Sequence, residues 1–477
     1  MTEMNTALRL RSSADGWRGV IGESFTPASA GLLAGCVVEV VASSPRVLVT
    51  HDGRRFGAQA AQAVVRAAQA AGARQVRLVP HLPTPTATAA VRLGEADLAL
   101  LVTASHNPPR WNGLKVKAAP GCPPPKAVER ATDELFGRRL QDALAGTGTD
   151  ADPVAEAESG DAVVGRHIED VLSRLPRRPT RRLSVVVDGL GGIAGGPTAR
   201  LCSELNWDVH AVGHLPAPDF GGLVPDPSVP ASRRRVTGEV LDRGADLGIV
   251  LDGDGDRVYV VDERGRTVQS HELLALLLEH RHRAGYGTPR RGVAVTASAG
   301  TAVRRVARWI GAPVKEFGIG FKHLSPQLAA GLADAAGGSV GDLAFAEYGV
   351  DRDPFAAIAL FADLLGATEL SVASLLDDLR ARVGDLSWFE AKVDGVADNA
   401  ALREAGLKAL AESRLDRSVS AVTETDGVKF WLGRGQWLLL RPSSTEGGVR
   451  IYGEFLAESA ADGLVQRVVE AVGTGLS

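Results

Sequence analysis

The chain alternates between short apolar runs rich in β-branched residues and longer amphipathic segments. Apolar runs cover residues 46–51, 98–102, 183–188, 247–251, 292–296 and 314–317, and helical patterns cover 56–71, 198–205 and 302–310. Short apolar runs predict buried strands, and apolar positions spaced by three and four predict helices. Alternation of the two at this spacing is typical of α/β units with largely parallel sheets. Because it recurs in three similar rounds, it predicts a tandem of related α/β domains.

The last part of the chain has a different pattern. From about residue 386, β-type runs follow one another at 391–393, 427–432, 437–441 and 450–454, and a helical segment follows at 459–472. Strands that follow one another before a helix indicate an α+β domain. The predicted domains are therefore 1–160, 161–267, 268–383 and 384–477. The expected fold class is α/β, with three tandem related domains of mixed, largely parallel sheets and a smaller α+β C-terminal domain.

Composition limits the classes of function. At 477 residues the chain is too long for one hydrophobic core, and its net charge of -4 argues against nucleic acid as the main partner. The N-terminus lacks an apolar signal core, and no apolar run approaches the roughly 18 residues that span a bilayer. We therefore expect a cytoplasmic protein with no membrane partner. The one dense basic run, residues 174–182, is interpreted as a solvated connection.

Two polar motifs directly follow predicted buried strands. Strand 98–102 leads into Thr103-Ala-Ser-His-Asn-Pro-Pro109, whose prolines disfavour helix and hold the turn extended. Strand 247–251 leads into Asp252-Gly-Asp-Gly-Asp-Arg257. Ligands of open α/β sheets bind beyond the carboxyl ends of strands, so both motifs lie where a site is expected. Taken alone, the serine motif also fits a generic polar turn.

The acidic motif places Asp252, Asp254 and Asp256 at alternate positions. Three like charges this close are costly unless a cation compensates them, and all-oxygen ligation suits Mg²⁺. An EF-hand calcium loop is a rival interpretation, because Glu263 stands at its twelfth position. That loop needs a glycine at its sixth position, where this chain has Arg257, and the following β-type run does not suit its helix. We therefore expect Mg²⁺, with a merely structural turn as the remaining alternative.

A third polar cluster, Arg441-Pro-Ser-Ser-Thr-Glu446, lies near the C-terminus. A guanidinium and neighbouring hydroxyls in one short loop suit a phosphate dianion. The candidate phosphate-binding residues are Arg441, Ser443, Ser444 and Thr445, with Arg450 to reinforce them.

In this order, the motifs resemble those of the α-D-phosphohexomutase superfamily, which includes phosphoglucomutases, phosphomannomutases and phosphoglucosamine mutases. Two further stretches carry the resemblance, Ser13-Ala-Asp-Gly-Trp-Arg-Gly19 and Gly318-Ile-Gly-Phe-Lys322. The C-terminal cluster is similar to the superfamily's phosphate-binding loop, which usually continues with proline where this chain has Gly447. The resemblance extends from Asp15 to Glu454 and implies four domains around a central cleft.

The resemblance also implies roles for individual residues. Ser105 is expected to carry a phosphoryl group and, together with the three aspartates, to bind Mg²⁺. Arg18 and Lys115 would offset the negative charge of the transferring group, and Lys115 or His106 would exchange a proton with the sugar hydroxyl. The remaining residues are Arg257, counted as catalytic, and Lys322, Glu347, Tyr348, Arg441, Ser443, Ser444, Thr445 and Arg450, counted as substrate-binding.

The chain departs from the superfamily in one place. The sugar-recognising loop usually reads Gly-Glu-x-Ser-Gly, whereas this chain has Phe345-Ala-Glu-Tyr-Gly-Val350, followed quickly by Asp351-Arg-Asp-Pro354. Read without a gap, Gly349 stands at the serine; with one residue deleted, Tyr348 does. Glu347 is kept, but the serine is lost in either alignment. The loop is also shortened, so the transfer chemistry is expected to be intact and the choice of sugar to differ.

These observations predict an intramolecular phosphotransferase that acts on a small-molecule sugar phosphate. It would move a phosphoryl group between positions of a sugar monophosphate through phosphorylated Ser105 and a sugar bisphosphate, which also serves as activator. A mutase for a non-standard sugar phosphate and a one-way phosphotransferase or phosphatase remain alternatives. The expected assembly is a monomer or a small homo-oligomer.

Overall fold

The computed structural model describes residues 10–13, 15–143, 156–285, 290–395, 398–412, 419–442, 448–456 and 463–475. They form two compact units. The first comprises the described parts of 1–268 with 328–331 and 340–373, and the second comprises those of 269–327, 332–339 and 374–477.

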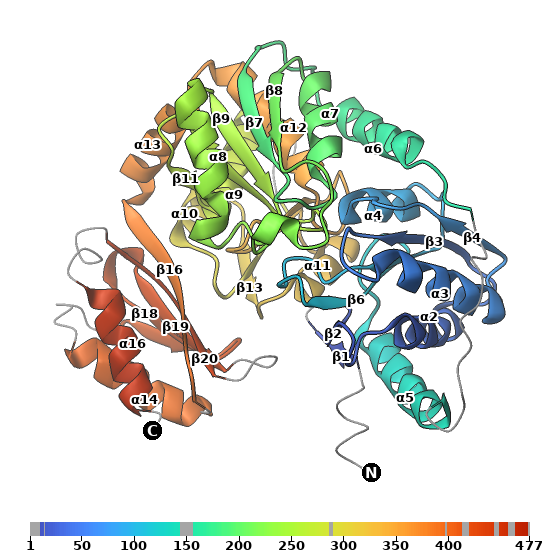
Figure 1. The fold of residues 1–477 in the computed structure, drawn as a ribbon. Helices are drawn as coiled ribbons and strands as arrows, with labels where there is room; N and C mark the ends of the chain where they lie inside the picture. Colours follow the sequence, from blue (N-terminus) through green and yellow to red (C-terminus); the bar gives the residue numbers. More distant parts are fainter. Residues whose placement is uncertain are drawn as a thin grey trace. The chain divides into compact units, whose positions relative to one another are not determined.

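The first sheet of the first unit has six strands, and the last three in its order, at one end of the sheet, run parallel. Its order is β1 (Arg11–Ser12), β2 (Trp17–Val20), β6 (Trp111–Ala118), β5 (Leu98–Val102), β3 (Arg46–His51) and β4 (Gln75–Leu78). β3 pairs in parallel with β4 and β5, whereas β6 runs antiparallel to β5. The helices are α2 (Pro27–Val41), α3 (Gly57–Ala70), α4 (Thr84–Arg92) and α5 (Lys126–Ala143). Valines and leucines of β3 and β5 pack with α2 and α3 in one hydrophobic core. The two helices lie side by side along this sheet (Figure 1).

The second sheet of this unit repeats the arrangement. Its order is β11 (Thr267–Val268), β10 (Val258–Asp262), β9 (Leu247–Leu251), β7 (Ser184–Asp188) and β8 (Asp208–Val212). β7 pairs in parallel with β8 and β9, and β10 runs antiparallel to β9. The helices of this part are α6 (Asp161–Ser173), α7 (Gly195–Glu204) and α8 (Pro230–Arg243), with the short η1 (Phe220–Gly222). β15 (Leu343–Phe345) and the buried helix α12 (Pro354–Thr368) complete the unit.

The second unit contains a parallel arrangement and an antiparallel one. β12 (Val293–Thr296) pairs in parallel with β13 (Val314–Phe317) and β14 (Ala335–Gly337). The antiparallel sheet has the order β16 (Leu386–Val393), β20 (Val449–Leu456), β19 (Trp437–Pro442), β18 (Val428–Trp431) and β17 (Ala421–Thr423). The helices are α9 (Ser270–Arg283), α10 (Thr301–Trp309), α11 (Ser325–Ala329), α13 (Val372–Val383), α14 (Asn399–Glu412) and α16 (Leu464–Gly475), with η2 (Phe321–His323) and η3 (Gly433–Gly435).

The predicted fold class is confirmed, and strands 46–51, 98–102 and 247–251 are present as β3, β5 and β9. β16 is longer than the predicted 391–393, because all eight of its residues pair with β20. The start of the predicted helix 459–472 lies outside the described residues. Within the described ranges, no single helix is long and apolar enough to cross a membrane, although the bent pair α12 and α13 meets the length and composition test together.

Candidate active site

Ser105 lies in a tight turn after β5. Its backbone has φ of +53°, in the left-handed region that few residues other than glycine adopt. Its N–H donates to Thr103 Oγ1 at 2.8 Å, and that hydroxyl donates to Asp52 Oδ2 at 2.7 Å. These two bonds hold the serine in its strained conformation at the carboxyl end of the strand.

The side chain of Arg54 organises the rest of the serine turn. It donates to four carbonyl oxygens, those of Ser105 at 2.6 Å, Asn107 at 2.7 Å, and Pro108 and Trp111 at 2.9 Å. Its Nε donates to Asp52 Oδ2 at 3.0 Å, and neither side chain of this pair is exposed. Sequence reasoning missed Arg54, since an arginine after a strand carries no signal of where its guanidinium points.

The acidic turn between β9 and β10 meets the serine turn directly. Ser105 Oγ donates to Asp252 Oδ2 at 2.8 Å, and Thr84 Oγ1 donates to Asp254 Oδ2 at 2.6 Å. The approach requires Gly253, because a Cβ there would lie 2.7 Å from the carbonyl oxygen of Ser105. Asp252 Oδ1 accepts from the N–H groups of Asp256 and Arg257, which closes the turn.

Lys115 is the main cation beside the aspartates. Its Nζ lies 2.7 Å from Asp254 Oδ2 and 2.6 Å from Asp256 Oδ2, in a position that is almost fully buried. Burial alone would lower the pKa of Lys115, but these carboxylates outweigh it and raise the pKa above the ordinary lysine value. The same balance holds for Asp254: burial opposes its ionisation, but Lys115 outweighs burial and lowers the pKa of Asp254 well below the usual range.

The three aspartates fit a divalent cation. One carboxylate oxygen from each lies within 4.8 Å of the others, and Asp254 Oδ1 and Asp256 Oδ1 are buried without a hydrogen-bond partner among the residues that the structure describes. Burial, followed by the charges of Asp254 and Asp256, raises the pKa of Asp252 well above its ordinary value. A bound cation would remove this penalty, and an all-oxygen donor set suits Mg²⁺.

The other catalytic residues expected from the sequence lie around these two turns. Arg18 is buried, and its Nη1 donates to the carbonyl oxygen of Thr103 at 3.1 Å. Arg257 Nη1 lies 3.7 Å from Asp226 Oδ1. Burial, and next the charge of Arg257, lowers the pKa of His106 well below its ordinary value, so His106 is neutral at pH 7.

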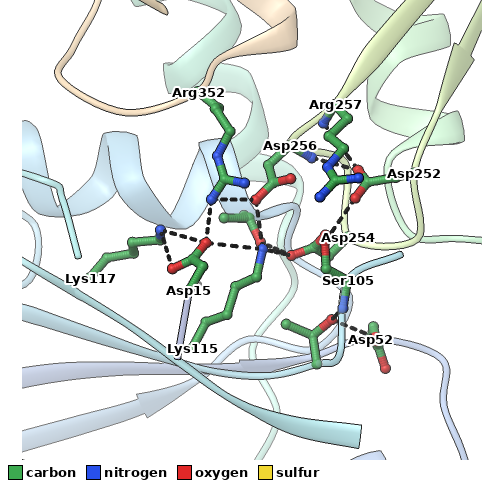
Figure 2. Close-up of polar contacts among 12 residues, drawn as sticks. Asp15, Asp52, Ser105, Lys115, Lys117, Asp252, Asp254, Asp256, Arg257 and Arg352 are labelled. Carbon is green, nitrogen blue, oxygen red and sulfur yellow. Dashed lines mark hydrogen bonds and ion pairs between the residues drawn. The ribbon is translucent and has the colours of Figure 1, made fainter. Parts of the chain in front are cut away.

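A buried charge network adjoins the aspartates, and sequence reasoning missed it. It consists of Asp15, Lys117, Asp351 and Arg352, and most of it is drawn in Figure 2. Arg352 Nη2 contacts Asp15 and lies 3.0 Å from Asp256 Oδ2. One signal was available: residues 115 and 117 lie two apart on a strand and so share a face.

The segment before α12, expected from the sequence to be shortened, buries one of its two candidate residues and exposes the other. Glu347 is exposed, and its carbonyl oxygen accepts from Arg174 Nη1 at 2.8 Å. Tyr348 is only 2% exposed, and with Arg92 of α4 it lines a cavity of about 10 Å³. The tyrosine ring is therefore part of the packing of this segment, and a substrate-binding role for it stays a prediction.

The second unit brings together two of the predicted substrate-binding segments. Asp426 Oδ2 accepts from Arg441 Nε at 2.8 Å and from the N–H of Ile319 at 2.7 Å. This carboxylate thereby links β19 to the segment that ends at Lys322 in η2. Arg441 is the cross-strand partner of Arg450, whose Nη1 donates to Glu390 Oε1 at 2.6 Å. The remaining predicted phosphate ligands, Ser443, Ser444 and Thr445, lie outside the described residues.

Tandem α/β sheets followed by an antiparallel one, with a strained serine bonded to a buried acidic turn, define the class of phosphosugar mutases. Models of the phosphoglucomutase/phosphomannomutase alpha/beta/alpha domains I, II and III match residues 9–141, 166–265 and 269–383. The chain belongs to this family, within the α-D-phosphohexomutase superfamily, so it is an intramolecular phosphotransferase of the isomerase class. The resemblance found in the sequence is thus confirmed.

Individual relatives match nearly the whole chain. A phosphoglucosamine mutase of Kineococcus radiotolerans is 30% identical over 469 residues, which cover 96% of this chain and 97% of the relative. The structure of a putative phosphomannomutase from Thermus thermophilus has a TM-score of 0.81 at 24% identity and covers 98% of this chain and 99% of its own. An Aspergillus fumigatus N-acetylphosphoglucosamine mutase, solved with GlcNAc-6P and magnesium, has a TM-score of 0.56 at 16% identity and covers 98% and 96%.

Proposed function

We propose that the protein interconverts two positional isomers of a sugar monophosphate through phosphorylated Ser105 and a sugar bisphosphate. The observation that carries this proposal is the 2.8 Å hydrogen bond from Ser105 Oγ to Asp252 Oδ2. In the described contacts, Ser105 supplies the one hydroxyl of the serine turn that bonds to the acidic turn. Its partner, Asp252, is a residue suited to Mg²⁺. Asp252, Asp254, Asp256 and the Ser105 phosphoryl group would hold the cation, which supplies charge neutralisation during phosphoryl transfer.

Two transfers make up the proposed cycle. In the first, the bond between phosphorus and Ser105 Oγ breaks, a bond forms between phosphorus and a sugar hydroxyl oxygen, and the hydroxyl proton passes to a base. After the bisphosphate has reoriented, Ser105 Oγ takes its other phosphoryl group, and the proton returns to the sugar oxygen released. Because its pKa is raised, Lys115 stays an ammonium group and offsets charge. Neutral His106 is then the acceptor we favour.

The substrate class follows from the relatives and from the altered segment. The Kineococcus relative is named a phosphoglucosamine mutase, so an aminohexose phosphate is the first substrate that we propose. A sugar phosphate with a different hydroxyl pattern is the second candidate. It is supported by residues 345–350, which contain no serine beside Glu347, and by the burial of the neighbouring Tyr348.

The proposed mechanism is tested on Ser105 itself. Intact mass and peptide mapping of the purified chain should find one phosphoryl group on Ser105, and Ser105→Ala should lose nearly all transfer between sugar phosphates. Ser203→Ala is the matched control, since Ser203 is exposed on α7 and its hydroxyl donates to the carbonyl oxygen of Ala199 in the same helix. Full mutase activity in Ser105→Ala would refute the phosphoserine mechanism, and release of inorganic phosphate without isomerisation would refute mutase action.

A further inference from the structure

The segment between β15 and α12 is tied to the first domain by a closed ring of four buried charges. Lys117 Nζ lies 3.0 Å from Asp15 Oδ1 and 2.6 Å from Asp351 Oδ2. Arg352 contacts Asp15 through Nη2, and its Nε lies 3.5 Å from Asp351 Oδ1. None of the four side chains is more than 10% exposed. Two carboxylates therefore face two cations with little water to screen them.

The end of the segment is held as firmly as its middle. Asp353 begins α12 and accepts from the N–H groups of Phe355 at 2.9 Å and Ala356 at 3.2 Å. Its other oxygen pairs with His167 Nε2 at 3.0 Å. Arg352 is thus fixed on both sides by bonds that do not involve the acidic turn.

Arg352, held by these contacts, reaches Asp256 of the acidic turn. Its Nη2 lies 3.0 Å from Asp256 Oδ2, the oxygen that Lys115 Nζ approaches at 2.6 Å. The other oxygen, Asp256 Oδ1, is buried without a hydrogen-bond partner in the described part of the chain. Two cations on one oxygen restrict the rotation of the carboxylate, and the second oxygen is left unused by the described residues and so available to a cation bound by the three aspartates.

We propose that Arg352 is a positioning residue of the metal site, which holds Asp256 ready to bind the cation, and that the ring of Asp15, Lys117 and Asp351 holds Arg352. This inference rests on the proposed Mg²⁺ site. Residues that orient metal ligands typically contribute about 10–100-fold to metal affinity. The sequence motif alone gives no hint of this role, because Arg352 lies 96 residues beyond Asp256.

The test measures metal binding directly. The full chain would be titrated with Mn²⁺ by electron paramagnetic resonance and with Mg²⁺ by calorimetry, for wild type, Arg352→Met and Arg352→Lys. Arg352→Met should raise the metal Kd by about 10–100-fold, and kcat should recover toward wild type at saturating Mg²⁺. Arg352→Lys should raise Kd less, since one ammonium group keeps the charge but cannot bridge Asp15 and Asp256. Arg92→Met is the control. Arg92 is a partly buried arginine near the same segment, and it forms its ion pair with Asp170.

Each outcome bears on the inference. A wild-type Kd in Arg352→Met, even with a lowered Tm, would show that Arg352 only tethers the segment. If Arg352→Met does not fold, an unchanged Kd in Arg352→Lys overturns the inference. A rise of equal size in Arg92→Met would do so as well. Wild-type turnover on sugar phosphates is scored separately: its absence would refute the proposed function, whereas a wild type that binds neither metal would refute the metal site.

Discussion

At the scale of single residues, the site is dominated by buried charged groups, most of which lie in ion pairs. Lys115, Lys117 and the three aspartates are all less than 2% exposed. Removing one partner from such a pair leaves an uncompensated buried charge, which costs far more than the pair contributes. Substitutions that change charge here are therefore expected to affect both folding and chemistry, so each needs a binding or kinetic measurement as well as a stability measurement.

Asp254→Asn should weaken metal binding and depress kcat. Loss of a residue that only hydrogen-bonds a metal ligand costs roughly 10–100-fold, so loss of a ligand should cost more. The amide is a poorer ligand than the carboxylate, and it leaves Lys115 less compensated at 2.7 Å. EDTA should inactivate the wild type reversibly. Asp378→Asn, an exposed change on α13, serves as control. Turnover that is independent of metal would contradict the assignment.

Arg441→Ala should raise KM by about tenfold to a hundredfold with a smaller fall in kcat. The proposed role of Arg441 is to bind the phosphate that is not being transferred, and a hydrogen bond to a charged group is worth about 1.5–3 kcal/mol. Steady-state kinetics test this, with exposed Arg434 of η3 changed to alanine as the control. A fall in kcat at constant KM would instead place Arg441 in the chemical step.

At the scale of elements, site residues that directly follow a strand could be predicted from the sequence. Site residues that reach the site from a different element could not. β5 and β9 could be recognised from their apolar runs, so Ser105 and Asp252 could be placed at strand ends. Arg54 and Arg352 could not, since each reaches the site from a different segment and local spacing does not encode such contacts. The basic run 174–182 is partly structural, because Arg181 donates to the carbonyl oxygens of Leu365, in the last turn of α12, and of Leu370, just after that helix.

In the second unit, a buried lysine joins β18 to β12 and β13 and should make stability depend on pH. Lys429 Nζ donates to the carbonyl oxygen of Ala297 at 2.6 Å and to Glu316 Oε2 at 3.0 Å, and it lies over Trp431 and Trp437. Burial, and next the charge of Arg304, lowers its pKa to about 7, although Glu316 favours the ammonium form.

The sign of the effect follows from proton counting. Between pH about 7 and the ordinary lysine pKa of about 10.4, the unfolded chain binds more protons at Lys429 than the folded chain. The free energy of unfolding should therefore rise with pH across this window, by at most about 1.4 kcal/mol per pH unit. Urea unfolding followed by tryptophan fluorescence should show this slope in wild type and in Lys408→Met, an exposed change on α14, and lose it in Lys429→Met. An equal slope in Lys429→Met would contradict the prediction.

At the scale of the whole molecule, the chain keeps the order of the family's domains I, II and III, and the departure expected from the sequence is confined to one short segment. The fold could be predicted because three rounds of alternating strands and helices, followed by an antiparallel set, leave few other arrangements. The consequence of the shortened segment could not be predicted. Whether Tyr348 faces a ligand or the interior depends on packing against α4, and no local pattern reports that packing.

Glucose and mannose phosphates should be poor substrates compared with aminohexose or otherwise substituted sugar phosphates. The serine hydroxyl expected near Glu347 is missing, so a hexose bound in the family's usual way loses a partner. The test is kcat/KM across hexose, aminohexose, deoxyhexose and pentose phosphates for wild type and Gly349→Ser, because Gly349 is one of the two candidate serine positions. A wild-type value of about 10⁶ M⁻¹s⁻¹ or more on glucose 1-phosphate, within the range of good enzymes, would show that the altered segment does not limit hexose use.

The positive φ of Ser105 also restricts which amino acid can serve as nucleophile. At +53° a β-branched side chain is a genuine outlier, whereas serine tolerates the conformation. Threonine offers the same hydroxyl, but its extra methyl group would strain the turn that Arg54 and Thr103 hold in place. Ser105→Thr should therefore be a poor phosphoryl carrier despite the retained alcohol. The backbone conformation at residue 105 therefore favours the primary alcohol of serine over the secondary alcohol of threonine, independently of any difference in their reactivity.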